Sequence, residues 1–192
     1  MQTPSHIAVS LLLWSDSVNW KQTCAIVTGA FLPDVTMFVF YGYQKAIGST
    51  ESDIWNTLYF EESWQLFFDV FNSIPIFLLL AIVGYLTRQR ILFLVSASAL
   101  VHVLCDLPVH NDDAHRHFLP FSNWRFISPL SYWDPKHFGI YVMVTELLAA
   151  VSSCIYLTLG DFARSVRVSA AVNLALYAAA ILAGLAYWIS LS

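Results

Sequence analysis

The stretch ILFLVSASALVHVLCDLP, residues 91–108, decides the class of fold. His102 and Asp106 are its only imidazole and carboxylate side chains, and it carries no Lys or Arg. Its length approaches the roughly 20 apolar residues that an α-helix needs to cross a bilayer. Asp106 follows His102 by four positions, so a helix places both side chains on one face. The stretch therefore predicts a membrane-spanning helix with two ionisable groups on one side.

The composition of the whole chain agrees with this prediction. Of 192 residues, 58% are hydrophobic and only 11% are charged, with a mean hydropathy of +0.62. A soluble domain has about 25% charged residues, because they cover its surface. Further long apolar segments occupy residues 24–43, 64–86, 138–159 and 168–189. We expect an all-α, polytopic membrane helix bundle of about five spanning helices, with residues 1–192 forming one integral membrane domain.

The first residues predict a shorter element. The apolar run at residues 7–14 is too short to cross a membrane, and no Lys or Arg precedes it as a signal peptide would require. Thr3 could cap a helix that has Pro4 at its first position. We expect residues 3–14 to form an N-terminal half-helix that enters the membrane and returns through residues 24–43.

Basic residues set the expected orientation. Arg88 and Arg90 lie in one short connection, and Arg164 and Arg167 lie in another. The positive-inside rule places both connections in the cytoplasm, so the 87–90 loop and the N-terminal turn with Lys21 are expected inside. The long connection at residues 109–137 is then outside. The net charge is −4 without a basic run, which disfavours nucleic acid as a partner.

Ionisable residues inside the predicted spans point to function. Each such group costs about 2.5–3.5 kcal/mol in a bilayer and is usually functional. Helical rise places several of them in the same half of the bundle. Imidazole and carboxylate groups together suit Zn²⁺, with Mn²⁺ or Fe²⁺ as alternatives, and such an ion would offset the buried negative charge. The groups concerned are His6, Asp34, Asp69, His102, Asp106 and Glu146.

Simpler explanations exist for each residue. Asp34 follows Pro33 and could cap a helix broken at that proline. Asp69 could lie at the membrane interface, and Glu146 could pair with Arg116 or Arg125. A single intramembrane histidine is commonly a hydrogen-bonded packing residue.

The expected outer loop, HNDDAHRHFLPFSNWRFISPLSYWDPKH at residues 110–137, is the second region rich in ionisable side chains. A further helical turn after Asp106 would bring His110 to the same face. Asp112 and Asp113 could extend the metal site or bind a second ion, and the segment from His115 to His117 could hold a phosphate. The loop could act as a lid, or it could simply be solvated surface with interfacial aromatic residues.

Four short motifs resemble one family. They are MQTPSH at residues 1–6, GAFLPD at 29–34, H-x-x-x-D-x-x-x-H from His102 to His110, and SPLSYWDPKHFG at 128–139. Together they resemble the YdjM-like membrane-bound, metal-dependent hydrolases of the bacterial inner membrane. The resemblance implies a multi-helix membrane protein with a divalent metal held by His6, Asp34, His102, Asp106 and His110.

One departure accompanies the resemblance. Where relatives have two histidines four positions apart near the second span, this chain has Asp69 and Ser73. Asp69 can still bind a metal, but serine is a poor substitute for histidine. The site is therefore expected to have lost a ligand or changed its metal.

The leading hypothesis is a metal-dependent hydrolase that acts on an ester or phosphoester of a membrane lipid or lipid-linked substrate. His6, Asp34, His102 and Asp106 would hold the metal, and Asp69 or His110 would complete its ligands. Glu146 would be the general base, with Asp113 and His115 of the outer loop acting beside it. A proton or metal-ion transporter using the same charges, or a non-enzymatic scaffold with a structural polar network, are the alternatives.

Overall fold

The computed structural model describes residues 1–191, and this part of the chain is helical without a strand. The α-helices are α1 (Thr3–Trp14), α2 (Trp20–Ala46), α3 (Glu51–Asn56), α4 (Glu62–Phe71), α5 (Ile74–Leu86), α6 (Arg90–Asp106), α7 (Gly139–Leu159) and α8 (Arg164–Leu191). Short 3₁₀ helices occur at η1 (Leu58–Phe60), η2 (Leu107–Val109) and η3 (Pro135–His137). The predicted all-α class is confirmed.

Four helical segments of the described chain are long and apolar enough to cross a membrane. They are Trp20–Ala46, Glu62–Leu86, Arg90–Val109 and Gly139–Leu159. These segments match four of the predicted spans and support an integral membrane protein. The remaining predicted span, residues 168–189, falls in α8, where the side chains of residue 181 and of residues from 183 onward lie outside the described part.

The span Glu62–Leu86 is divided into α4 and α5. Ser73 caps α5, since its side-chain oxygen accepts a hydrogen bond from the Ile76 amide at 3.3 Å. Pro75 follows in the first turn, where its missing N–H has no cost. Ser73, the position at which the chain departs from the resembled family by lacking a histidine, is therefore a helix cap that also donates to the Leu119 carbonyl at 2.5 Å.

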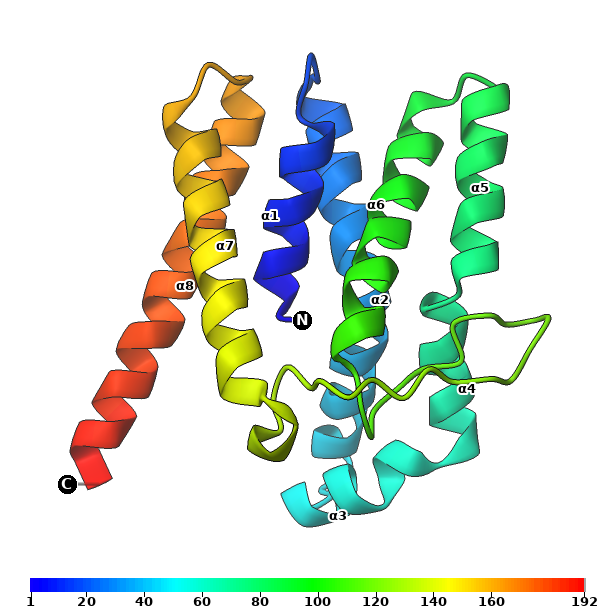
Figure 1. Ribbon diagram of the computed structural model, residues 1–192, viewed down its shortest axis with the longest axis vertical. Helices are drawn as coiled ribbons and strands as arrows, with labels where there is room; N and C mark the ends of the chain where they lie inside the picture. Colours follow the sequence, from blue (N-terminus) through cyan, green and yellow to red (C-terminus); the bar gives the residue numbers. More distant parts are fainter. Residues whose placement is uncertain (192) are drawn as a thin grey trace.

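Helix α6 lies at the centre of one half of the bundle, with α2 on one side and α5 on the other. Helix α1 packs among α2, α6, α7 and α8. Figure 1 shows that the N-terminus of α1 ends at mid-height of the bundle, beside the C-terminal half of α6. The turns α1–α2, α5–α6 and α7–α8 lie at one end, and the 110–134 connection crosses the other end (Figure 1).

The start of α1 differs by one position from the expectation. Gln2, not Thr3, is the N-cap residue, and no side chain of the cap accepts from the first turn. Thr3 is already inside the helix, and its hydroxyl donates to Asp34 Oδ2 at 2.5 Å. The threonine predicted as a cap therefore links α1 to α2.

Helix α2 continues through Pro33 to Ala46. Asp34 therefore lies within a continuous helix, and the alternative that it caps a broken one is wrong. At Gly29, one turn before Pro33, α2 and α6 approach so closely that an added Cβ would lie 2.1 Å from the Val95 carbonyl oxygen. This contact sets the spacing between the helix that carries Asp34 and the helix that carries His102.

We expect Gly29→Val to destabilise the bundle, because backbone atoms of α6 cannot move aside for the new side chain. Overpacking typically costs about 1–3 kcal/mol. Gly42→Val is the matched control, since it lies in the same helix with open space around its Cβ position. Thermal unfolding in detergent should show a lower midpoint for Gly29→Val alone, and equal midpoints for the two variants would contradict the close contact.

Candidate metal centre

The centre of the site is one face of α6. His102 and Asp106 are both buried, and His102 Nε2 lies 3.0 Å from Asp106 Oδ2. The four-residue spacing that predicted a shared face is confirmed. A carboxylate and an imidazole are thus held together near the C-terminal end of a predicted span.

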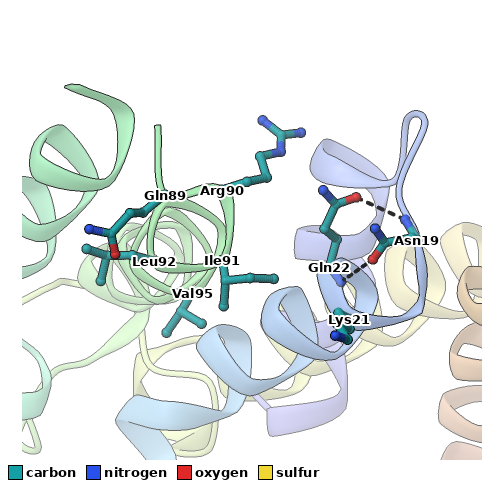
Figure 2. Close-up of a pocket in the computed structure, with 8 residues that line it drawn as sticks. All are labelled: Asn19, Lys21, Gln22, Gln89, Arg90, Ile91, Leu92 and Val95. Atoms are coloured by element: carbon teal, nitrogen blue, oxygen red, sulfur yellow. Dashed lines mark hydrogen bonds between the residues drawn. The ribbon is translucent and has the colours of Figure 1, made fainter. Parts of the chain in front are cut away.

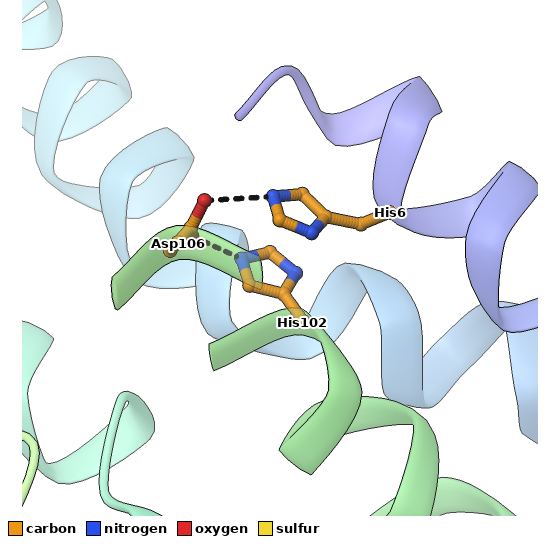
Figure 3. A group of neighbouring side chains, drawn as sticks. All are labelled: His6, His102 and Asp106. Carbon is orange, nitrogen blue, oxygen red and sulfur yellow. Dashed lines mark ion pairs between the residues drawn. The ribbon is translucent and has the colours of Figure 1, made fainter. Parts of the chain in front are cut away.

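His6 joins this pair from α1. Its ring stacks on the His102 ring with a centroid distance of 3.4 Å and an interplanar angle of 7°, and its Nε2 lies 3.1 Å from Asp106 Oδ1 (Figure 3). One ligand atom from each of the three residues lies within 4.8 Å of the other two. We call His6, His102 and Asp106 the His-His-Asp cluster.

The hydrogen bonds of His102 identify which ring nitrogen faces the cluster. Its Nδ1 lies 2.6 Å from the Ala30 carbonyl oxygen, which can only accept, so Nδ1 carries a proton. In the neutral ring Nε2 then has a lone pair directed at Asp106. A backbone carbonyl is one of the groups that commonly accept from the outer nitrogen of a metal-binding histidine and orient its ring.

Several polar atoms of the cluster are buried without a hydrogen-bond partner in the described chain. They include His102 Nε2 and both ring nitrogens of His6, although His102 Nε2 and His6 Nε2 lie within ion-pair distance of Asp106. Buried polar atoms are rarely left unsatisfied, because each one costs about 1–3 kcal/mol. A cation bound by His6 Nε2 and His102 Nε2 would satisfy the two nitrogens that face Asp106.

The spacing of the ligand atoms suits such a cation. Tetrahedral zinc with bonds of about 2.1 Å to nitrogen or oxygen places its ligand atoms about 3.4 Å apart. The contacts of Asp106 with His102 and His6, at 3.0 and 3.1 Å, are close to this value. The donor types and their separations therefore suit a divalent metal, and binding it through both imidazoles would require the two stacked rings to turn toward the ion.

Asp34 and His110 lie at the edge of the cluster. Asp34 Oδ1 is 3.6 Å from His102 Nε2, and His110 Nε2 is 3.4 Å from Asp106 Oδ1. Helix η2 continues α6 far enough for His110 to remain near the predicted face. The structure thus brings together His6, Asp34, His102, Asp106 and His110, five of the six residues predicted to bind metal.

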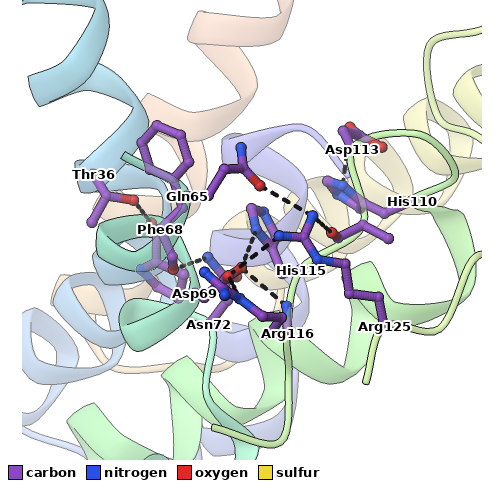
Figure 4. A network of polar contacts seen from close by, with 12 residues as sticks. Thr36, Gln65, Phe68, Asp69, Asn72, His110, Asp113, His115, Arg116 and Arg125 are labelled. Carbon is purple, nitrogen blue, oxygen red and sulfur yellow. Dashed lines mark hydrogen bonds and ion pairs between the residues drawn. The ribbon is translucent and has the colours of Figure 1, made fainter. Parts of the chain in front are cut away.

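Asp69, the sixth predicted ligand, is held elsewhere. Its Oδ1 lies 3.2 Å from His115 Nδ1 and accepts from the Arg116 amide at 3.0 Å, while its Oδ2 contacts the Arg116 guanidinium (Figure 4). Arg125 Nη2 lies 3.7 Å from the same oxygen. Among the described residues, the ion pairs of Asp69 are with these loop side chains. The negative charge of Asp69 is therefore balanced by arginines of the loop. Arg116 and Arg125 pair with Asp69 and not with Glu146, which was the alternative expected from the sequence.

Glu146 of α7 packs against the first turn of α1. Its Oε1 accepts from the Gln2 amide at 2.6 Å and from the Ser5 hydroxyl at 2.5 Å, and Ser5 also contacts Tyr177. An anion at a helix N-terminus is favoured by the helix dipole. Glu146 therefore fixes the turn that carries His6, and its second oxygen is buried without a hydrogen bond in the described structure.

The predicted loop residues Asp113 and His115 contact different partners, Asp113 on the side of the His-His-Asp cluster and His115 on the side of Asp69. Asp113 Oδ2 is 3.0 Å from His110 Nδ1, so His110 connects Asp113 with Asp106. Burial alone would lower the pKa of His110, but the two carboxylates raise it to about 9. His115 links instead to Asp69. The nearby His117 is buried, and burial together with His115 lowers its pKa to about 4.

A cavity of about 80 Å³ adjoins the cluster, and Asp34, Asp106, His110, Asp113 and His115 are among the residues that line it. A larger hollow of about 660 Å³ lies between the N-terminal turns of α2 and α6, where Lys21, Arg90 and apolar side chains line it (Figure 2). That hollow contains none of the predicted site residues. The smaller cavity is therefore the one lined by the candidate metal-binding and catalytic side chains.

No family model matches this chain, and no curated protein or solved structure is significantly similar to it. The chemistry of the cluster therefore has to be inferred from its own atoms. Sequence reasoning missed the Ala30 carbonyl, the hydroxyl of Thr3 and the amino group of Met1, which is positively charged and forms an ion pair with Asp106. A backbone group leaves no signal in a residue pattern, so the first and the last could not have been found.

Proposed function

We propose that this chain is a membrane-bound, metal-dependent hydrolase acting on an ester or phosphoester of a lipid or lipid-linked substrate. The observation that carries the proposal is the His-His-Asp cluster, whose buried imidazole nitrogens face a buried carboxylate without hydrogen bonds. The resemblance to the YdjM-like family supports the same chemistry, since five of its implied ligands lie at this cluster.

His6, His102 and Asp106 would hold the ion, with Asp34 and His110 as further ligands. Zinc suits this set of donors best, and manganese or iron(II) are alternatives. Such an ion supplies Lewis-acid activation of water and of the substrate's carbonyl or phosphoryl oxygen. The loop at residues 110–126 would cover the substrate's headgroup, with Asp113 facing the cavity and His115 tied to Asp69.

The role of Glu146 follows from its hydrogen bonds. Because Oε1 already accepts from Gln2 and Ser5, this carboxylate acts first by positioning α1 and with it His6. Its unpartnered Oε2 remains available to accept a proton from water that reaches the cluster. Glu146 is therefore our candidate general base as well as the anchor of α1.

We also propose the membrane arrangement. Helix α8 would form a fifth span, and α1 would be a half-helix that ends inside the bilayer beside the cluster. The basic connections at residues 87–90 and 160–167 would face the cytoplasm, and the loop at residues 109–137 would face outward. The resemblance suggests the inner membrane of a bacterium.

Metal analysis of detergent-purified protein tests the proposal. We expect about one zinc equivalent in the wild type and its loss in both His102→Ala and Asp106→Ala. His137→Ala is the matched control, because His137 pairs with Asp134 away from the cluster. A wild type that binds no metal after supplementation would favour the scaffold, and metal uptake into vesicles would favour the transporter.

A further inference from the structure

A second hollow lies beside the inner cavity. This groove of about 500 Å³ has aromatic walls formed by Trp55, Tyr59, Phe60, Tyr132 and Trp133. Trp55, Phe60 and Trp133 are each about half exposed, at 42%, 53% and 51%, so their rings are accessible. Exposed aromatic side chains that line a hollow commonly provide a surface for a ligand.

The groove and the inner cavity share part of their walls. Met37, Tyr59, Asp113 and Tyr132 line both spaces. A molecule whose ester group lies at the His-His-Asp cluster would therefore extend its next group into the groove. The groove is thus placed to recognise the part of the substrate adjacent to the bond that is cleaved.

The charges in the groove are of one sign. Asp112 and Asp113 line it, whereas no Lys or Arg is among its described lining residues. One oxygen of Asp113 contacts His110, and the other, Oδ1, is buried without a hydrogen bond in the part of the chain that is described. The groove therefore has acceptor capacity that its own residues do not use.

Aromatic faces carry negative electrostatic potential and attract cations within about 6 Å of the ring. Burial, followed by the charge of Asp113, raises the pKa of Tyr59 and of Tyr132, so both phenols stay neutral donors. Neutral aromatic rings beside two carboxylates form the environment that binds alkylammonium groups. A phosphate or a sulfate would meet only negative charge in this groove.

We propose that the groove binds an alkylammonium group, so that the substrate is a lipid with an ammonium-bearing headgroup. The binding of the cation depends on the groove alone, whereas its assignment to the substrate rests on the proposed hydrolase. In a zwitterionic phospholipid the phosphate would lie at the His-His-Asp cluster and the ammonium between the rings. Asp113 lines both spaces, so its carboxylate would favour binding of substrates that carry this cation over substrates that lack it.

Choline and its neutral isostere 3,3-dimethyl-1-butanol provide the test, since they share shape and differ in charge. We would titrate both into the detergent-purified full chain and follow binding by saturation-transfer NMR and tryptophan fluorescence. Choline should bind about 5- to 30-fold more tightly, as expected from about 1–2 kcal/mol of cation–π and carboxylate attraction. Trp133→Leu and Asp113→Asn should each remove most of this preference.

Trp124→Leu is the matched control, because Trp124 is an exposed loop tryptophan outside the groove and should leave the preference unchanged. Equal binding of choline and the isostere, or tighter binding of a neutral methyl glucoside, would overturn the inference. Metal content is measured on the same samples. Retained metal without choline preference rejects only the headgroup assignment, and choline preference without metal rejects only the hydrolase.

Discussion

Saturating zinc will raise the unfolding temperature of the wild-type protein by about 10 °C and leave that of Asp106→Asn nearly unchanged. A ligand at a thousandfold its dissociation constant stabilises the folded state by about 4 kcal/mol. In a chain of this size each kcal/mol shifts the midpoint by about 2–4 °C. Asp106 contacts both His6 and His102, so losing its charge removes the central ligand of the cluster.

The controls for this experiment use both the ion and the residue. Magnesium prefers oxygen ligands and should give a small shift in every variant. Asp53→Asn replaces an exposed carboxylate of α3, far from the cluster in sequence and contacts, and should keep the full zinc response. An equal zinc response in Asp106→Asn and the wild type would show that the ion binds elsewhere.

Arg116→Met will destabilise the protein by about 3–5 kcal/mol, because it leaves the buried charge of Asp69 without its main partner. The Asp69 side chain is 0% exposed and that of Arg116 is 11% exposed. The loop at residues 110–126 should become sensitive to protease, since the Arg116 amide and side chain tie it to α4. Denaturation midpoints and limited proteolysis measure the two effects.

The double variant Asp69→Leu/Arg116→Met separates charge from packing. The double variant removes the buried carboxylate together with its main partner, so it should be more stable than Arg116→Met alone. Zinc content should persist in it, because Asp69 is bonded to the loop and not to the His-His-Asp cluster. Loss of zinc in the double variant would instead identify Asp69 as a ligand.

The parts of the fold that the sequence predicted are those governed by local periodicity. Long apolar runs predicted the four membrane-crossing segments, and the spacing of His102 and Asp106 predicted their common face. The proximity of His6 was predicted from the shortness of the first helix, since only a half-length element places it near mid-depth. Each of these inferences needs only the rise and twist of a helix.

The parts that failed depend on contacts between distant segments. Asp69 lies away from the His-His-Asp cluster because it pairs with Arg116 and Arg125. The positions of these arginines in an irregular loop follow no periodic pattern. The sequence around Thr3 indicates a possible cap because capping is local, whereas the Thr3 hydroxyl donates to Asp34 on another helix. The partner of Glu146 was equally hidden, since it is mainly the backbone and first turn of α1.

The long-range bonds of α1 determine when the cluster can be assembled. Glu146 bonds to the Gln2 amide across 144 positions, and Asn173 donates to the Pro4 carbonyl across 169. During synthesis α1 is therefore made well before α7 and α8, the helices that hold its first turn. Because α7 and α8 hold the first turn of α1, we expect His6 to be fixed only after both helices have been made, and the proposed metal would then bind late in biogenesis.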